Sequence, residues 1–466
     1  MQKLQCISPI DNRVYVERPL ATEYQIQNAL GSARSAQLAW RLVPMAERVE
    51  LVRAAVANLQ KLKDVLAEEI CWQMGRPITY ASGEIDGLAE RALYMAELAE
   101  SDGSPLQDIS LPEKNGYTRF IRREPLGTSL VIAPWNYPYL TAINAVVPAL
   151  LAGNSVILKH SAQTPLCAER LVDAFSEAGL PAGVFQYLHL GHRDAEQLII
   201  RGNVQHVAFT GSVSGGAAVE SAAAGRFLTV GLELGGKDPA YVRADADLEY
   251  AVDSVVDGAF FNSGQSCCGI ERLYVHRSAY DEVVARAVQK INQYRLGRSD
   301  EPETTLGPLV RASAADFVRD QIDEAVAQGA HAHIDEGAFA LDCRGSAYMA
   351  PQLLTNVDHD MRVMNEESFG PVLGVVPVRD DEEALALMND SEYGLTAAIY
   401  SADEQVALHL GDRLRAGTVF LNRCDYLDPA LAWTGVKNSG RGCTLSGIGF
   451  EHLTRAKSFN FKLQRG

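Results

Sequence analysis

From residue 127 onward, the sequence alternates between short apolar runs and stretches with helical periodicity, and this alternation restricts the fold more than any other feature. The apolar runs include GTSLVIAPWNYP, GNSVILKHSAQTP and VQHVAFTGS, and the helical stretches span 138–152, 165–179 and 214–224. Such alternation is typical of βαβ units, in which a helix returns the chain to a neighbouring parallel strand. We therefore expect an α/β fold with a doubly wound, Rossmann-type nucleotide-binding domain.

A second α/β domain and two exposed strands are expected outside this region. Residues 245–420 repeat the alternation, for example in GPVLGVVPV, and residues 25–100 are mainly helical. The segment 115–126 and the tail RAKSFNFKLQRG alternate polar and apolar side chains, as edge strands do. The chain has 466 residues, more than the ~250–300 that one hydrophobic core usually serves, so several domains are expected.

The charge balance argues against nucleic-acid and membrane partners. The 42 basic and 59 acidic residues give a net charge of -17, which would repel a phosphate backbone or an anionic membrane surface. The N-terminus lacks a basic segment followed by an apolar one, and Pro148, Gly153 and Asn154 interrupt the longest apolar stretches. We expect a cytoplasmic protein without a membrane span.

The cysteines and histidines predict neither a disulfide framework nor a metal site. The 8 cysteines are scattered along a long chain without a secretory signal, so most should be reduced thiols. No C-x-x-C pair occurs, and the pairs His189/His192 and His331/His333 have no further ligands beside them at zinc spacing.

Two glycine-rich turns follow predicted strands. The turn GSVSGG at 211–216 leads into an alanine-rich helix, and either a pyrophosphate site or an ordinary helix cap would explain it. The turn at 231–238 fits G-x-x-x-x-G-K but ends in Asp238 instead of Ser or Thr, which argues against ATP binding. Glu233 in this turn is either a general base or a carboxylate in solvent.

Asn136 and the stretch GQSCC are the remaining candidates for chemistry. Asn136 in PWNYP follows a buried strand, where ligands bind in open α/β sheets, and its amide suits an oxyanion, although turns also favour asparagine. GQSCC ends in the adjacent pair Cys267 and Cys268. A thiolate stabilised by a helix N-terminus is a nucleophile, whereas a buried cysteine is commonly structural. These residues alone leave both interpretations open and do not separate the two thiols.

Taken in order, the motifs resemble those of the NAD(P)-dependent aldehyde dehydrogenase superfamily. They are PWNYP (134–138), AGNSVILKHSAQTP (152–165), FTGS (209–212), LELGGKDP (232–239), GQSC (264–267), EESFGPV (366–372) and WTGVKNSGRG (433–442). The resemblance implies a cofactor domain, an α/β catalytic domain and a small β oligomerisation element, which would make a homodimer or homotetramer. The expected boundaries are 1–102 and 126–235 for the first, 236–451 for the second, and 103–125 and 452–466 for the third.

The resemblance also implies a role for each matching residue. Cys267 matches the catalytic thiol, Glu233 the general base and Asn136 the oxyanion-hole amide, so an aldehyde would be oxidised through a thiohemiacetal and a thioester on Cys267. NAD or NADP is the implied cofactor, and no metal is implied. The residues implied to bind the cofactor are Ile132, Pro134, Trp135, Lys159, Gly211, Ser212, Leu234, Glu367 and Phe369.

Two features bear on specificity. Ala162 stands where NAD-preferring members commonly carry a glutamate that binds the adenine ribose, so we expect NADP to be accepted, with Lys159 and His160 pairing with its 2′-phosphate. A tunnel that favours an apolar or aromatic aldehyde is expected from three residues, namely Tyr137, Phe261 and Trp433. The segment CTLSGIGF also departs from the usual RE-x-G ending, which leaves the anchoring of the C-terminal region open.

Other functions stay possible within this resemblance. A semialdehyde dehydrogenase would need a clamp for the substrate carboxylate, and Arg272 is better interpreted as structural. A CoA-acylating aldehyde dehydrogenase would lack a base such as Glu233. A non-catalytic relative would not be expected to keep Cys267, Glu233 and Asn136 together, and a cysteine hydrolase would need no cofactor for its chemistry.

Overall fold

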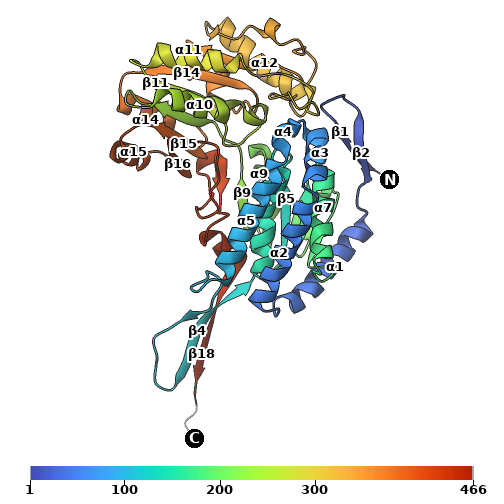
Figure 1. The fold of residues 1–466 in the computed structure, drawn as a ribbon. Coiled ribbons are helices and arrows are strands. Elements are labelled where there is room, and N and C mark those ends of the chain that lie inside the picture. The colour runs from blue at the N-terminus through green and yellow to red at the C-terminus, as the bar shows by residue number, and fades with distance from the viewer. Residues whose placement is uncertain (1, 464–466) are drawn as a thin grey trace.

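Two largely parallel sheets, each covered by helices, organise residues 2–463, which are the residues that the computed structural model describes (Figure 1). The first sheet is formed mainly by the N-terminal half of the chain and the second by most of the C-terminal half (Figure 1). The predicted α/β fold with a Rossmann-type domain is therefore confirmed.

The first sheet has 6 strands, and its strand order reverses in the middle. In spatial order the strands are β17 (Gly440–Arg441), β9 (Thr229–Glu233), β8 (His206–Thr210), β5 (Thr128–Ala133), β6 (Ser155–His160) and β7 (Phe185–Tyr187). All pairs are parallel except that between β17 and β9. Because β5 leads to β6 on one side while β8 lies on the other, a crevice is expected at the carboxyl ends of β5 and β8.

Helices cover both faces of this sheet because its central strands are apolar on both sides. Leu130 and Ile157 face one hydrophobic cluster, and Val131 and Leu158 face the other. Continuous apolar runs of this kind are typical of buried parallel strands. The helices that follow or precede these strands are α1 (Glu23–Trp40), α2 (Met45–Lys61), α3 (Lys63–Met74), α4 (Ile78–Ala81), α5 (Gly83–Glu100), α6 (Pro138–Leu151), α7 (Pro165–Glu177), α8 (His192–Arg201) and α9 (Val213–Ala223).

The second sheet has 7 strands and repeats the same design. In spatial order its strands are β12 (His331–Ala332), β13 (Gln352–Thr355), β14 (Val372–Val378), β11 (Ile270–His276), β10 (Asp238–Val242), β15 (Thr396–Tyr400) and β16 (Thr418–Leu421). Only β12 runs antiparallel to its neighbour. Its helices are α10 (Leu248–Phe260), α11 (Tyr280–Ile291), α12 (Ala312–Ala327), α13 (Arg362–Asn365), α14 (Asp381–Asn389) and α15 (Glu404–Gly411).

Aspartates begin three of the helices that follow strands of the second sheet. Asp247 accepts a hydrogen bond from the backbone N–H of Tyr250 at the start of α10. Asp380 and Asp403 cap α14 and α15 in the same way. A carboxylate at this position satisfies N–H groups that have no partner within the helix and typically stabilises it by about 1 kcal/mol.

Two antiparallel elements lie outside the sheets. β1 (Lys3–Ile7) and β2 (Val14–Pro19) form a hairpin, whereas β18 (Thr454–Lys462), β4 (Tyr117–Pro125) and β3 (Ile109–Ser110) form an arm that projects from the body (Figure 1). The predicted exposed strands are therefore the two long strands of this arm.

Charged side chains fasten the base of the arm. Glu124 accepts hydrogen bonds from Arg41, Arg455 and Lys457, and these contacts, Arg41 first, lower its pKa to about 2. The two strands are thus tied to each other and to α1.

The predicted domain boundaries remain a prediction. The range 103–125 contains β3 and β4, and 452–466 contains β18, with 464–466 outside the described residues. β17 falls within the range 236–451 yet pairs with β9 in the first sheet. None of the described helices is both long enough and apolar enough to cross a membrane.

Candidate active site

Six of the predicted site residues, which come from separate parts of the chain, line a cavity of about 510 Å³. Tyr137 precedes α6, Glu233 ends β9, Phe261 and Cys267 belong to the loop after α10, and Trp433 comes from the C-terminal segment. Leu234, predicted to contact the cofactor, also lines this cavity. The structure therefore brings the predicted thiol, base and tunnel residues together.

The loop that carries Cys267 has an unusual backbone. Asn262, Ser263 and Gly264 all have positive φ angles, of 54°, 57° and 72°. Such angles cost energy for residues other than glycine and need support from their surroundings. The Ser263 hydroxyl donates to the Gly307 carbonyl (2.8 Å), and Gln265 Oε1 accepts from the backbone N–H of Val310 (2.8 Å).

Asn136 is buried beside this loop, not in the wall of the cavity. Its Nδ2 donates to the carbonyl of Gln265 at 3.2 Å, two residues before Cys267. An amide group has two N–H donors, so one donor remains for a further acceptor. The side chain is thus fixed next to the thiol and keeps hydrogen-bonding capacity.

Arg76 and Glu84 hold Asn136 in place, and the sequence analysis did not identify either residue. They form a buried ion pair, with 2% and 0% of their side chains exposed. Arg76 donates to the Asn136 carbonyl (2.5 Å) and to Asn262 Oδ1 (3.1 Å). Glu84 accepts from the backbone N–H of Tyr139 (2.9 Å) at the start of α6. In the sequence, GRP at 75–77 signals only the end of a helix.

Glu233 is held by two threonine hydroxyls. Thr444 Oγ1 donates to Oε1 at 2.5 Å and Thr210 Oγ1 donates to Oε2 at 3.0 Å. Burial raises the pKa of the carboxyl group, and the two hydrogen bonds oppose this effect. Thr444 lies in the segment CTLSGIGF, so this departure from the usual motif supplies a partner for Glu233.

The two adjacent cysteines have different surroundings. Cys267 is half-buried, whereas Cys268 is only 3% exposed. The Cys268 thiol donates to Asp425 Oδ1 at 2.9 Å, and the same oxygen accepts from the Ser266 hydroxyl at 3.0 Å. A hydrogen bond with Cys267, followed by burial, raises the pKa of Cys268 well above its ordinary value. Cys268 is therefore a protonated donor within the protein.

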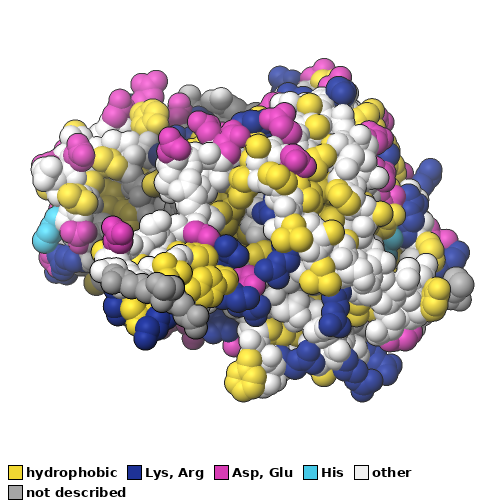
Figure 2. Space-filling model, turned by 90° about the horizontal axis from the view of Figure 1, so that it is seen from below, with side chains coloured by type: hydrophobic (Ala, Val, Ile, Leu, Met, Phe, Trp, Pro, Cys, Tyr) yellow, Lys and Arg dark blue, Asp and Glu magenta, His cyan; other side chains and the backbone are white. Residues whose placement is uncertain are grey.

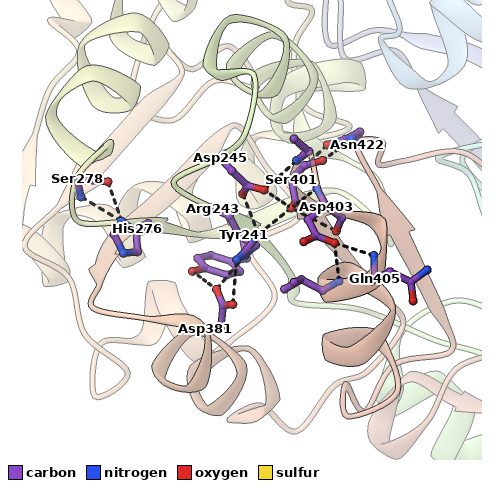
Figure 3. Close-up of polar contacts among 12 residues, drawn as sticks. Tyr241, Arg243, Asp245, His276, Ser278, Asp381, Ser401, Asp403, Gln405 and Asn422 are labelled. Atoms are coloured by element: carbon purple, nitrogen blue, oxygen red, sulfur yellow. Dashed lines mark hydrogen bonds and ion pairs between the residues drawn. The ribbon is translucent and has the colours of Figure 1, made fainter.

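Asp425 belongs to a loop after β16 that is anchored by a polar network in the second sheet (Figure 3). Asn422 exchanges two hydrogen bonds with the backbone of Ser401, and the Ser401 hydroxyl accepts from Arg243. Arg243 in turn binds Asp381 (Figure 3). This network fixes the point at which the loop turns towards the cavity, where Cys424, Asp425, Tyr426 and Leu427 line the wall.

Four predicted cofactor residues lie at the carboxyl ends of neighbouring strands in the first sheet. Ile132 in β5 is in register with Lys159 in β6, and Gly211 and Ser212 follow β8. Ser212 caps α9 by accepting from the backbone N–H of Gly215 at 3.2 Å. Burial lowers the pKa of Lys159. These residues lie at the same edge of the sheet as the N-terminus of α9 and the strand reversal, a usual place for a pyrophosphate.

The other predicted cofactor residues lie where the two sheets meet. Trp135, which follows Pro134, packs edge-on against Phe369 with ring centroids 5.6 Å apart. The backbone N–H of Gly236 donates to Glu367 Oε1 at 2.9 Å. Burial, then the charge of Glu271, raises the pKa of Glu367 to about 7.

The expected role of His160 in binding a phosphate is wrong. Its ring is 3% exposed, Nε2 lies 3.0 Å from the Pro138 carbonyl, and Nδ1 is within 3.0 Å of the Thr164 hydroxyl. Burial lowers its pKa to about 4, so the ring is neutral at pH 7. The residues that are still predicted to lie near the adenine ribose are Lys159 and the exposed Ala162.

The structural interpretation of Arg272 agrees with its contacts. The side chain is buried and donates to backbone carbonyls, including those of Lys237 (2.8 Å) and Met388 (3.2 Å). It does not line the cavity that holds Cys267. No group of three or more metal-ligating side chains occurs among residues 2–463.

The sequence matches the model of the Aldehyde dehydrogenase family over residues 1–459. The succinate semialdehyde dehydrogenase (NAD(P)+) of Escherichia coli is 34% identical over 447 residues, covering 96% of this chain and 95% of that protein. A probable betaine aldehyde dehydrogenase of Schizosaccharomyces pombe is also 34% identical, over 93% of this chain and 86% of the relative.

Solved structures show the same similarity. The NADP-dependent glyceraldehyde-3-phosphate dehydrogenase of Bacillus halodurans, complexed with NADP, is 30% identical and superposes with a TM-score of 0.92, covering 99% of this chain and 96% of that one. The betaine aldehyde dehydrogenase of Staphylococcus aureus, in complex with NAD+, is 28% identical with a TM-score of 0.93, covering 100% and 93%.

Replacing Gly264 with alanine should destabilise the protein and remove its activity. The positive φ costs another residue about 1–2 kcal/mol, and a Cβ would overlap the carbonyl of Gly370, for which overpacking adds about 1–3 kcal/mol. The fall in unfolding temperature measures the effect. Gly345→Ala is the matched control, because Gly345 also has a positive φ, of 78°, but faces open space. Equal losses in the two variants would show that the contact with Gly370 does not matter.

Proposed function

The chain belongs to the aldehyde dehydrogenase family, and from this premise we propose that it oxidises an aldehyde to a carboxylic acid through a covalent intermediate on Cys267. Family membership makes it an NAD(P)-dependent oxidoreductase of the aldehyde group. The observation that carries the proposal is a cavity that one thiol and one carboxylate line, with the amide of Asn136 buried beside the loop that holds the thiol. Each group supports one step of the reaction.

The first step is attack of the Cys267 thiolate on the aldehyde carbon. The half-buried thiol lines the cavity and its neighbour Cys268 donates to Asp425, so Cys267 is the thiol left for substrate. The oxyanion of the thiohemiacetal needs donors that are already oriented. The Asn136 amide, held by Gln265 and Arg76, supplies such a donor next to the thiol.

The thiohemiacetal is next oxidised to a thioester, and the thioester is then hydrolysed to release the acid. A bound NAD(P)+ supplies the two-electron oxidant that converts the thiohemiacetal into a thioester. Hydrolysis then needs a base near the thioester, and Glu233 lines the same cavity as Cys267. Glu233 thus favours hydrolysis over transfer of the acyl group to CoA, and the retained thiol, base and amide favour catalysis over a binding role.

The residues at the strand ends suit a dinucleotide. Ser212 and the glycines of 211–216 leave the N-terminus of α9 open to a pyrophosphate, and Lys159 lies on β6, two strands from the β8 strand that precedes α9. The nicotinamide half of the dinucleotide would then lie beside Trp135, Phe369 and Glu367. Acceptance of NADP+ is supported by Ala162, which places no carboxylate near a 2′-phosphate.

The cavity walls support an apolar or aromatic stem next to the aldehyde. Tyr137, Phe261 and Trp433 line it, together with Leu140 and Leu427. The relatives are named for succinate semialdehyde and for betaine aldehyde, which carry opposite charges, so their names do not decide the charge of this substrate.

The arm supports self-association into a homodimer or homotetramer. Its strands stack Phe120 on Phe459 with centroids 4.5 Å apart, while Phe461 and Ile109 are exposed. The face seen along the arm presents hydrophobic side chains beside Lys and Arg side chains (Figure 2). Such a surface can extend a sheet of a second copy.

The two adjacent thiols should respond differently to substitution. Cys267→Ser should lower kcat/KM for aldehyde oxidation by about 10³-fold or more, because a hydroxyl is a far weaker nucleophile. Cys268→Ser keeps a donor for Asp425 and should stay within about fivefold of wild type. Formation of NAD(P)H at 340 nm measures both. The opposite pattern would assign the reaction to Cys268.

Glu233→Gln should slow hydrolysis of the thioester by about 10²–10⁴-fold. The first turnover should still form NAD(P)H, because this step precedes hydrolysis. In the wild type, the base must be ionised and its pKa is raised, so kcat should fall on the acid side at a pH above 4.5. The variant should lack this acid limb. Rapid-mixing kinetics across pH test this, and an unchanged steady-state rate in Glu233→Gln would exclude Glu233 as the base.

NADP+ should support oxidation with a kcat/KM at least comparable to that of NAD+. Ala162→Glu should lower kcat/KM for NADP+ by about tenfold or more, because a carboxylate repels the 2′-phosphate, and should spare NAD+. Steady-state kinetics with each cofactor measure the ratio. A strong NAD+ preference in the wild type would contradict the expectation.

A further inference from the structure

Carboxylates dominate the charged lining of the cavity that holds Cys267. Besides Glu233, the lining includes Asp86, Glu90, Asp257 and Asp425, whereas Arg91 is the one cation among the described lining residues. A cavity with low-dielectric walls focuses the field of such charges on the ligand inside. The lining should therefore discriminate between substrates by the sign of their charge.

Asp425 brings negative charge close to the reacting thiol. Its Oδ1 lies 2.9 Å from the Cys268 sulfur and 3.0 Å from the Ser266 hydroxyl, both neighbours of Cys267. Burial raises its pKa to about 6, so the group is still mostly ionised at pH 7.5. The loop after β16 thus places a carboxylate in the cavity wall, next to the two neighbours of Cys267.

Asp257 and Glu90 extend the negative charge along the cavity from two different helices. Asp257 is on α10, one turn before Phe261, and within residues 2–463 its carboxylate has no hydrogen-bond or ion-pair partner. Glu90 is on α5 and accepts from the Tyr426 hydroxyl at 2.9 Å. Asp86 is different, because Lys63 forms an ion pair with it at 2.6 Å. Three carboxylates thus face the cavity without a protein cation bound to them.

Arg91 does not cancel these charges. Its Nη1 lies 3.3 Å from both the Leu140 carbonyl and the side-chain amide of Asn144, so the guanidinium is tied to the wall at α6. One cation is outnumbered by the three unpaired carboxylates and by Glu233. An anionic substrate would meet net repulsion in this cavity, and a cationic one net attraction.

The aromatic side chains of the wall would also stabilise a cation. Phe261 and Trp433 line the cavity, and the faces of such rings attract ammonium groups, whereas Tyr137 and Tyr426 already lie against the guanidinium groups of Arg76 (4.5 Å) and Arg423 (3.6 Å). Aromatic walls and unpaired carboxylates together form the kind of surface that recognises alkylammonium groups. An apolar stem next to the aldehyde remains compatible with this arrangement.

We propose that the substrate is an aldehyde that carries a positively charged nitrogen on its chain, held by Asp425, Asp257 and Glu90 and by the aromatic wall. This inference rests on the proposed function and specifies the substrate class of the same site. Asp257 and Glu90 act on the charged end, whereas Cys267, Asn136 and Glu233 act on the aldehyde.

A pair of isosteric aldehydes tests the charge directly. 4-Trimethylammoniobutanal and 5,5-dimethylhexanal have the same shape but differ by one positive charge, and succinate semialdehyde supplies a negative charge. At low ionic strength, the cation should have a kcat/KM about tenfold or more above that of the neutral isostere, and the anion should be the poorest of the three. Salt at 0.5 M should reduce the advantage of the cation.

Single substitutions test which carboxylates cause the preference for a cationic aldehyde. Asp257→Asn should reduce the ratio of cation to neutral kcat/KM by about threefold or more, and Glu90→Gln should do so in the same direction. Glu249→Gln is the matched control, because Glu249 lies on the same helix α10 and does not line the cavity. It should leave the ratio unchanged. The salt dependence of the wild type tests the inference even if a variant does not fold.

The outcomes separate the two proposals. Absence of NAD(P)H formation with every aldehyde would contradict the proposed function. Oxidation of the neutral isostere at the same or a higher kcat/KM than the cation would overturn the inference alone, as would a preference for succinate semialdehyde. A ratio that is unaffected by salt and by Asp257→Asn would likewise overturn it.

Discussion

The buried ion pair between Arg76 and Glu84 is the interaction on which the geometry of the site depends. Burying two charges is costly, and this arrangement offsets the cost because all three guanidinium nitrogens of Arg76 and both carboxylate oxygens of Glu84 form hydrogen bonds. Glu84 accepts from the first backbone N–H groups of α6, and Arg76 donates to the Asn136 carbonyl and to Asn262. One pair thereby connects α5, the end of β5 and the loop that carries Cys267. Loss of either partner would leave an uncompensated buried charge next to Asn136 and the loop that carries Cys267.

The remaining polar groups of the site follow from this connection. The loop with three positive φ angles is fixed at one end by Arg76 and at the other by Gly307 and Val310, so Cys267 faces the cavity while Cys268 turns to Asp425. Glu233 reaches the same space from β9 because β17 pairs with it and Thr444 binds its carboxylate. The reacting groups thus come from three elements that are rigidly joined, as preorganised catalysis requires.

The sequence predicted the local features of this site better than the long-range ones. Three residues of the site lie at the ends of strands, namely Asn136, Glu233 and Ser212. In the sequence, short apolar runs followed by turn residues mark these strand ends, and the motifs around them resemble those of a known family. Arg76, Thr444 and Asp425 are far from these motifs in the chain, and their partners are set by tertiary packing that no local pattern encodes. His160 shows the same limit, since the sequence places it beside Lys159 but does not reveal that its ring is buried under Pro138 and Thr164.

The central claim is that Cys267 carries the acyl group between oxidation and hydrolysis. The most direct test is to mix Glu233→Gln with NAD(P)+ and the aldehyde oxidised fastest, quench with acid after one turnover, and locate the added mass by peptide mass spectrometry. The account predicts one acyl group per chain, attached to Cys267, with Cys268 unmodified. An acyl group on Cys268, or full NAD(P)H formation without any thioester on Cys267, would contradict it.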